Sequence, residues 1–386
     1  MNNILKVLAV LLAGILVFGA ARYLDNNYGR TTPEIQDTQA AVAQTVPVTT
    51  EPQQTQTEPA PIPQETAETQ PLETTPPEES IRTYVLTFAG DCVLGCMEEH
   101  NQAGYGFRMV VGEDYDYPFQ NVRSYFQEDD LTLLNLEGVL TDEGYPLEKR
   151  FAFRGPEAYV NILSQNSVDV VSLANNHTGD YGEDGYKATV EALEGADIPY
   201  VEQDCGTLIP LEGGLTVGIY GTVYNTVQTD AVTEGIRKLK EEGADLIIYA
   251  PHWGTEYSYR TMQEQEKLAQ AAIEAGADIV YGCHPHVLQP IEEYKDGVIY
   301  YSLGNFSFGG NIYPPDYDTA LIQQEVHMDQ DGTVTLGQRK IIPCSISSIA
   351  GRNNYQPTPY AVDSEEYKRV LSKLDGSFKG ILNVNR

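Results

Sequence analysis

The feature of this sequence that most constrains its fold is a series of short apolar segments, each followed at once by an acid, an amide or a histidine. The segments and the residues that follow them are VLTFAG before Asp91, LTLLNL before Glu137, VDVVSLA before Asn175, Asn176 and His177, DLIIYAP before His252, DIVYGC before His284 and His286, and VIYYSLG before Asn305. In open α/β sheets, the loops at the carboxyl ends of the strands share one edge, where ligands bind. If the segments are strands, these distant side chains meet at one place.

Past residue 80, the apolar segments alternate with amphipathic stretches, a pattern that is typical of an α/β domain. We expect strands at residues 84–88, 131–136, 168–173, 215–220, 245–249, 278–281 and 298–302. We expect helices at residues 157–165, 185–193, 232–241 and 263–275, and a closing helix at 365–374. Residues 325–326 and 333–341 have the pattern of later antiparallel strands.

The polar residues after the strands indicate a metal site when they are taken together. Each alone is typical of a turn, a helix cap or an ordinary packed histidine. However, four of the six histidines follow a predicted strand, and only His100 and His327 do not. Imidazole and carboxylate groups together are the ligands of zinc and other divalent transition metals. In His284-Pro285-His286, the proline ring restricts the backbone between two histidines, so both side chains can face the same cavity.

Composition excludes several other classes of function. Lys and Arg number 24 against 56 Asp and Glu, a formal net charge of −32, which repels nucleic-acid phosphates and anionic lipid. We therefore expect no nucleic-acid partner. The five cysteines do not form a disulfide scaffold, and the Cys92-x-x-x-Cys96 spacing matches no common zinc motif.

The amino-terminal part predicts an anchor followed by a tether. Residues 7–21 are apolar and uncharged, a length between that of a signal peptide and that of a membrane-spanning helix. We interpret 1–24 as an uncleaved signal anchor, with a cleaved signal peptide as the alternative, and a buried core helix as a third reading. Residues 25–80, rich in Thr, Pro, Gln and Glu, are expected to be a disordered linker before a domain at 81–386. The domain would then be extracytoplasmic, held at the cell membrane by a single span or secreted.

Seven motifs carry a resemblance to a known family. They are GDCVLG (90–95), NLEGVLTD (135–142), FRGPE (153–157), SLANNHTGDYGEDG (172–185), PHWGTEY (251–257), GCHPHVLQP (282–290) and YSLGNFSFG (301–309). In this order they resemble the bacterial capsule-synthesis CapA proteins, which are associated with poly-γ-glutamate capsule. That family resembles a branch of the calcineurin-like metallophosphatase superfamily. The resemblance implies a four-layer sandwich, in which two mixed β-sheets are flanked by helices and a metal centre lies at one edge.

The resemblance also implies roles for individual residues. It implies metal ligands at Asp91, Glu137, Asn176, His252, His284 and His286, with His177 acting on the substrate. The superfamily's first motif is Asp-x-His, whereas this chain has Asp91-Cys92-Val93, so one ligand of the first metal is missing. Because neighbouring residues of a strand point to opposite faces, Cys92 is expected to point away from Asp91. The cofactor is therefore one or two divalent ions (Mn, Zn or Fe).

Each charged residue near these motifs has two possible roles, one at the site and one elsewhere. Lys149, Arg150 and Arg154 either recognise an anion beside the site or are ordinary surface charges. Arg154 is the candidate for anion recognition, because it lies in a family motif. Asp180 either orients His177 or caps the next helix, and we favour capping for Glu183 and Asp184.

The sequence is consistent with three functions. The first is a cell-surface metal-dependent hydrolase that acts on a phosphoester or on an amide-linked capsule polymer. The second is a non-catalytic accessory subunit that binds or guides an anionic capsule polymer for a membrane synthetase. The third is a scaffold that holds one structural metal. The metal ligands favour the first function, and the family name favours the second.

Overall fold

The computed structural model describes residues 81–102, 104–223 and 228–382. These residues belong to one compact unit, Glu73–Arg386. The predicted anchor at 1–24 and the predicted linker at 25–80 lie outside the described residues. In the described part of the chain, no helix has both the length and the hydropathy needed to cross a membrane.

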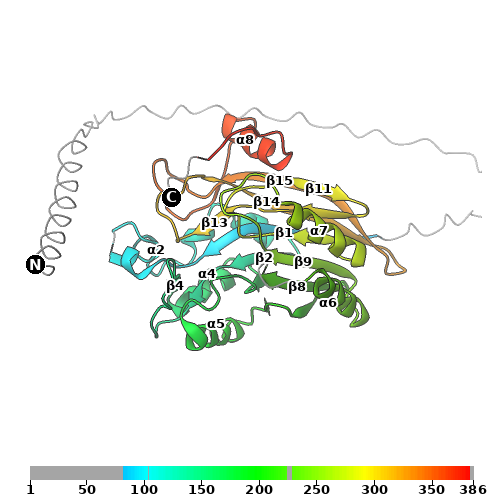
Figure 1. The fold of residues 1–386 in the computed structure, drawn as a ribbon, viewed down its shortest axis with the longest axis horizontal. Coiled ribbons are helices and arrows are strands. Elements are labelled where there is room, and N and C mark those ends of the chain that lie inside the picture. Colours follow the sequence, from blue (N-terminus) through cyan, green and yellow to red (C-terminus); the bar gives the residue numbers. More distant parts are fainter. Residues whose placement is uncertain (1–80, 103, 224–227, 383–386) are drawn as a thin grey trace, which may run out of the picture. The chain divides into compact units, whose positions relative to one another are not determined.

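The larger sheet has eight strands and is parallel on one side and antiparallel on the other (Figure 1). Its order is β16 (Thr358–Pro359), β15 (Val334–Ser345), β14 (Asp318–Met328), β1 (Arg82–Val93), β2 (Leu131–Leu136), β5 (Val170–Ser172) and β6 (Tyr200–Val201), and β13 (Asn305–Phe308) also pairs with β1. Strands β13, β1, β2, β5 and β6 are parallel neighbours, whereas β14 and β15 are antiparallel. The expected antiparallel strands are thus confirmed, and both are longer than the sequence pattern indicated.

The smaller sheet has six strands. Its order is β11 (Ile291–Tyr294), β12 (Gly297–Tyr300), β10 (Ile279–Tyr281), β9 (Leu246–His252), β8 (Thr216–Val223) and β7 (Gly206–Pro210). The four inner strands are parallel, and the two edge strands are antiparallel to their neighbours. A further pair of two-residue strands, β3 (Val139–Leu140) and β4 (Arg154–Gly155), lies outside both sheets.

The helices largely follow the expected pattern. Helices α7 (Gln263–Ala275) and α8 (Glu365–Leu374) have the expected bounds, and α6 (Thr229–Glu241) and α5 (Gly182–Gly195) begin three residues earlier than expected. The remaining elements on the larger sheet are α2 (Phe107–Val111), η2 (Tyr117–Phe119), α3 (Arg123–Gln127), η3 (Glu157–Tyr159) and α4 (Val160–Ser164), preceded by η1 (Glu98–Gln102). The helix expected at 157–165 is therefore a 3₁₀ turn followed by a short α-helix.

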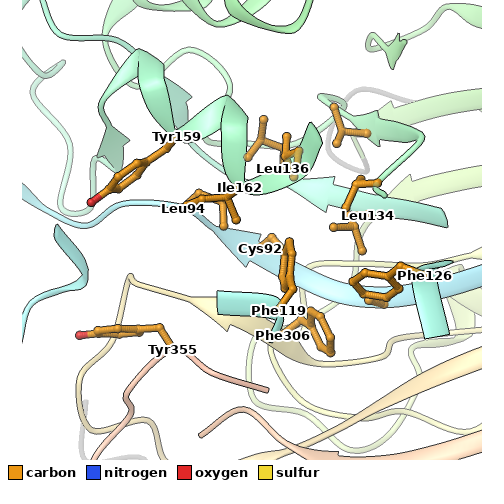
Figure 2. Packing of buried hydrophobic residues seen from close by; sticks show 14 of the residues in the cluster. Cys92, Leu94, Phe119, Phe126, Leu134, Leu136, Tyr159, Ile162, Phe306 and Tyr355 are labelled. Atoms are coloured by element: carbon orange, nitrogen blue, oxygen red, sulfur yellow. The ribbon is translucent and has the colours of Figure 1, made fainter. Parts of the chain in front are cut away.

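Three buried clusters give the layers of the domain. One lies between the two sheets, with Leu86 and Leu133 from the larger sheet and Ile219 and Ile248 from the smaller one. A second packs the outer face of the larger sheet against α2 to α5, and Figure 2 shows part of it around Phe306. The third packs the smaller sheet against α6 and α7. The order helix, sheet, sheet, helix is the four-layer arrangement that the resemblance implied.

Aspartates hold the register of the parallel strands at the amino ends. Each directly precedes one strand and accepts a hydrogen bond of 2.7–2.8 Å from a backbone N–H of the neighbouring strand: Asp130 from Val85, Asp169 from Thr132, Asp245 from Thr216 and Asp278 from Ile247. Such bonds satisfy amides at strand ends that would otherwise lose a partner. Part of the negative charge of the chain thus lies at the edge of the sheets opposite the predicted site.

The carboxyl group of Asp129, beside these aspartates, is expected to cost stability at neutral pH. Burial raises its pKa to about 7, although the Thr132 hydroxyl donates a 2.6 Å hydrogen bond to it. Because the folded-state pKa lies above the ordinary value of 3.8, the folded protein binds this proton more tightly than the unfolded chain does. The cost is absent at low pH, grows as the pH rises towards 7, and is complete at pH 8.

We therefore expect Asp129→Asn to raise the free energy of unfolding by about 1–3 kcal/mol at pH 8 and to leave it nearly unchanged at pH 4. Urea unfolding at the two pH values measures the difference. The matched control is Glu128→Gln, the same charge change at the exposed neighbouring residue. An equal effect of Asp129→Asn at both pH values would contradict the pKa shift.

Candidate metal centre

The carboxyl ends of the parallel strands of both sheets meet at one cluster. Asp91 lies on β1 and is paired in register with Asn135 of β2 and Asn305 of β13, so the three side chains form one row across three strands. Glu137 directly follows β2, and its N–H donates to the carbonyl of Cys92 at 2.8 Å. From the smaller sheet, His252 is the last residue of β9, and His284 and His286 follow β10.

Two groups of three side chains in this cluster have the spacing of metal ligands. Glu137, His252 and His284 form one group, and Asp91, Glu137 and His286 form the other, with the ligand atoms of each group within 4.8 Å of one another. Glu137 Oε1 is 3.7 Å from His252 Nε2 and 3.9 Å from His286 Nε2. Because Glu137 belongs to both groups, it has the position of a carboxylate that bridges two ions.

The carboxylate of Glu137 is the clearest sign that these residues fit a cation. Its side chain is fully buried, and within the described residues neither carboxylate oxygen has a hydrogen-bond partner. Burial raises its pKa well above the ordinary value, which the nearby His286 only partly opposes. A buried carboxylate without hydrogen bonds is costly, and a divalent cation held by these residues would offset that cost.

The first group has neutral imidazoles that converge with an amide oxygen. His252 Nε2 lies 2.8 Å from Asn176 Oδ1 and 3.1 Å from His284 Nδ1. Burial, reinforced by the neighbouring histidines, lowers the pKa of His252 well below its ordinary value and that of His284 to about 4. Both rings are therefore uncharged at neutral pH, the form in which imidazole binds metals. Asn176 is thus placed to add an oxygen to this group.

The second group is held by amides. Burial disfavours a charge on His286, but Glu137 and Asp91 outweigh this effect and raise its pKa to about 9. His286 Nδ1 lies 2.9 Å from Asn305 Oδ1 and 3.4 Å from Asp91 Oδ2. On the other side, Asn135 Nδ2 donates a 2.8 Å hydrogen bond to Asp91 Oδ1. The amides thus fix both an acid and a histidine of the same group.

The backbone of the His-Pro-His segment is strained so that both rings reach the cluster. His284 has φ 99° and His286 has φ 56°, in a region that non-glycine residues rarely adopt. The carbonyl of Pro285 between them accepts a 2.7 Å hydrogen bond from the N–H of Tyr257. Strain of this kind is found at sites where the surrounding structure must hold a side chain in one direction.

Cys92 points away from the cluster, as its place on the strand predicts. It is fully buried in the hydrophobic cluster behind the larger sheet, where Figure 2 shows it beside Phe119 and Leu94. Val93, at the position of the histidine in Asp-x-His, is buried against Phe153 and Phe308. This chain therefore has an apolar contact where the superfamily motif has a ligand.

His177 lies beside the two groups and belongs to neither. Its Nδ1 is 2.7 Å from Asp180 Oδ2, and its Nε2 is 3.8 Å from Glu137 Oε1. Its ring packs on Phe153, with 4.4 Å between the ring centroids. Burial lowers the pKa of His177, and the hydrogen bond to Asp180 partly opposes this effect. Asp180 thus orients His177, whereas Glu183 and Asp184 lie in the first turn of α5.

Lys149, rather than the expected Arg154, contacts residues of the site. The guanidinium of Arg154 lies 4.8 Å from the centre of the Tyr181 ring and 3.3 Å from Glu98. Among the described contacts, none joins it to the two ligand groups. The ammonium of Lys149, in contrast, contacts the Asp180 carboxylate and donates a 3.0 Å hydrogen bond to the carbonyl of Asn176.

Of the amides that support the site, sequence reasoning placed Asn175 and Asn305 at strand ends but missed Asn135. Asn175 Nδ2 donates to Asn135 Oδ1 at 3.1 Å and to the carbonyl of Leu136 at 2.8 Å, and the N–H of His177 donates to Asn175 Oδ1 at 3.0 Å. Asn135 was hidden inside the apolar run LTLLNL. Its distance of two residues from Glu137 was the available signal, because such residues share one face of a strand.

Two solved structures, one named a nucleotidase and the other a phosphatase, are distantly similar to this chain. The NAD nucleotidase of Haemophilus influenzae is 13% identical with a TM-score of 0.40, and the match covers 78% of this chain and 63% of that one. The purple acid phosphatase of yellow lupin is 11% identical with a TM-score of 0.29, with 75% and 58% covered. These TM-scores are too low for either likeness to support a conclusion about this chain.

Comparison with related sequences identifies the family of this chain. The family model for the bacterial capsule synthesis protein PGA_cap matches residues 85–202 and 214–310. The capsule biosynthesis protein CapA of Bacillus anthracis is 30% identical over 316 residues, which cover 75% of this chain and 72% of the relative. The PGA biosynthesis protein CapA of Bacillus subtilis is 30% identical over 311 residues, with 75% and 77% covered. A probable polyglutamine synthesis accessory protein of Mycobacterium tuberculosis is 28% identical over 239 residues, with 51% and 61% covered. The chain therefore belongs to the bacterial capsule synthesis protein PGA_cap family.

Proposed function

We propose that this protein acts in the synthesis or export of a poly-γ-glutamate type of capsule polymer, as a metal-dependent hydrolase at the cell surface. The observation that carries the proposal is the Glu137 carboxylate, which is fully buried, has no hydrogen-bond partner among the described residues, and belongs to two groups of metal ligands. The bond that it cleaves would be a phosphoester or an amide of the polymer. The names of the Bacillus relatives, which refer to capsule and PGA biosynthesis, support the polymer.

The side chains of the cluster have separate roles in this mechanism. Glu137, Asn176, His252 and His284 would hold one divalent ion, and Asp91, Glu137 and His286 would hold a second. When bound, such ions supply positive charge next to the scissile bond and an acidified water as nucleophile. His177 has Nδ1 fixed by Asp180 and Nε2 directed towards the cluster, so Nε2 can protonate the leaving group or stabilise its charge.

We further propose that the domain lies outside the cytoplasm, held at the membrane through residues 1–24 and tethered by residues 25–80. The apolar, uncharged run at residues 7–21 supports an anchor, and a cleaved signal peptide with secretion is the alternative. A partner synthetase in the membrane would then supply the polymer close to the site.

A non-catalytic accessory subunit is the second candidate function. Two observations favour it: the Mycobacterium relatives carry the name accessory protein, and the superfamily's Asp-x-His is Asp91-Cys92-Val93 here. With a net charge of −32, such a subunit would need bridging cations to bind a polyanionic polymer. The metal cluster would then be a binding site for polymer carboxylates.

Metal analysis combined with a substrate panel separates the two functions. The full-length chain is stripped with a chelator, reloaded with Mn²⁺ and assayed on an aryl phosphodiester and on poly-γ-glutamate. We expect one or two Mn²⁺ ions per chain, one for each ligand group that is filled, and hydrolysis that depends on them. Bound Mn²⁺ with no hydrolysis of either substrate would favour the accessory subunit. A chain that binds no Mn²⁺ would overturn both.

A further inference from the structure

The side chain of Asp180 lies in the middle of a set of contacts that the mechanism above uses only in part. It is fully buried, and three donors surround its carboxylate: the ammonium of Lys149, the N–H of Phe153 at 2.6 Å, and His177 Nδ1 at 2.7 Å. Its backbone carbonyl accepts a further hydrogen bond of 2.8 Å from the N–H of Leu147. Asp180 therefore joins the segment 147–153 to the residue that would transfer the proton.

Lys149 is the only cation among these donors, and it contacts more than Asp180. Its Nζ donates to the backbone carbonyl of Asn176 at 3.0 Å and lies 3.4 Å from His177 Nδ1. One ammonium thus contacts the backbone of a proposed metal ligand, the carboxylate behind His177, and the edge of the His177 ring. Without Lys149, the buried Asp180 carboxylate would lose its counter-charge, and a buried charge without a partner is unstable.

The segment that carries Lys149 has few other attachments. Most residues from Asp142 to Phe151 are exposed, including Tyr145 at 90% and Leu147 at 53%. Phe153, the aromatic side chain that packs on His177, lies two residues after this exposed run. Phe153 is also packed against Val93 and Phe308, and its N–H donates to the same Asp180 carboxylate that Lys149 contacts.

We propose that Lys149 is a positioning residue, whose ammonium fixes Asp180, His177 and the Asn176 backbone in one arrangement and thereby holds the segment 147–153 to Asp180. The part of this proposal that concerns hydrolysis rests on the function proposed above. The part that concerns the position of the segment does not, because it can be measured in the metal-free protein without substrate.

The first test is hydrogen exchange of the metal-free, full-length chain. The amides of Leu147 and Phe153 donate to Asp180, so Lys149→Met should speed their exchange by about 10- to 100-fold, while amides of β8 and β9 keep their wild-type rates. Lys149→Arg should restore most of the protection, since a guanidinium also supplies charge and donors. Unchanged exchange at Leu147 and Phe153 in Lys149→Met would overturn the proposal.

The second test is kinetic, with the Mn²⁺-loaded, full-length chain and an aryl phosphodiester. Lys149→Met should lower kcat by about 10- to 100-fold, with KM within about twofold of wild type and partial recovery in Lys149→Arg. The matched control is Lys187→Met, which removes the same charge from an exposed position on α5. A raised KM with unchanged kcat would make Lys149 a substrate-binding residue, and a lowered Tm with unchanged kcat would make it merely structural; both results overturn the proposal.

The two tests also distinguish failure of this proposal from failure of the proposed function. One outcome is that the wild-type chain shows no hydrolysis, while Lys149→Met still speeds exchange at Leu147 and Phe153. In that case the hydrolase function fails and the positioning role of Lys149 stands. If the wild-type chain hydrolyses the ester and Lys149→Met changes neither kcat nor exchange, the hydrolase stands and the positioning role fails.

Discussion

Glu137→Gln is expected to abolish metal binding and at the same time to make the metal-free protein more stable. Glu137 is the only residue shared by the two ligand groups found in the described part of the chain, so its loss damages both. Changes to residues that merely support metal ligands cost about 10- to 100-fold in affinity, and we expect the loss of a bridging ligand to cost at least about 100-fold. Metal titration of the purified chain measures this loss.

The gain in stability follows from the same carboxylate. Burial raises the pKa of Glu137 well above its ordinary value, so ionisation at neutral pH is costly when no cation is bound. An uncharged amide of nearly equal size removes that cost, and we expect the metal-free free energy of unfolding to rise by about 1–3 kcal/mol. Glu143→Gln, at an exposed glutamate six residues along the chain, should change neither property. Retained Mn²⁺ or a less stable metal-free protein would argue against the assigned role of Glu137.

His177→Ala is expected to separate catalysis from metal binding. Because His177 belongs to neither ligand group, the variant should keep wild-type Mn²⁺ content. Its hydrolysis of an aryl phosphodiester should fall by about 10²- to 10⁴-fold, the range that proton transfer by a positioned side chain contributes. The measurements are metal analysis and kcat on the same preparations.

The control for His177→Ala is His327→Ala, the same change on β14, where the histidine contacts Thr83 at the end of β1 opposite to Asp91. It should leave both Mn²⁺ content and hydrolysis unchanged. If His177→Ala loses its metal together with its activity, His177 is a ligand and the division of roles is wrong. If it hydrolyses the ester at the wild-type rate, another group transfers the proton.

The location of the site could be predicted because it depends on a local pattern. An apolar run predicts a strand, and in a parallel sheet the residue after the run lies at the carboxyl edge whatever its distance along the chain. That rule places Asp91 with Glu137 on the larger sheet and His252 with His284 on the smaller one, and the packing of the two sheets against each other brings both pairs together. The same local reasoning placed α7 and α8 at their observed bounds, since both have one apolar face along their whole length.

The supporting residues could not be predicted because their roles depend on contacts between distant segments. Lys149 lies in a polar, mostly exposed run, and its partner Asp180 is 31 residues away, so no spacing rule joins them. Arg154 lies in a family motif, yet the fold turns its guanidinium onto Tyr181. Asn135 has an amide inside an apolar strand. Its spacing from Glu137 indicates a shared face, but its hydrogen bond to Asp91 follows only from the register of β1 and β2.

The orientation of Cys92, in contrast, followed from strand geometry alone. Successive side chains of an extended strand alternate between faces, so a ligand at Asp91 requires its neighbour to point into the opposite layer. The buried position of Cys92 behind the larger sheet agrees with that rule. The same rule gives Val93 the face of Asp91, but its apolar side chain offers no ligand atom.

An anomalous difference map from crystals of the full-length chain grown with Mn²⁺ would locate the metal directly. We expect a peak between Glu137, His252 and His284, and a second peak, where the site is filled, between Asp91, Glu137 and His286. A map with no peak within bonding distance of the Glu137 carboxylate, at Mn²⁺ concentrations that saturate the protein in solution, would contradict this expectation.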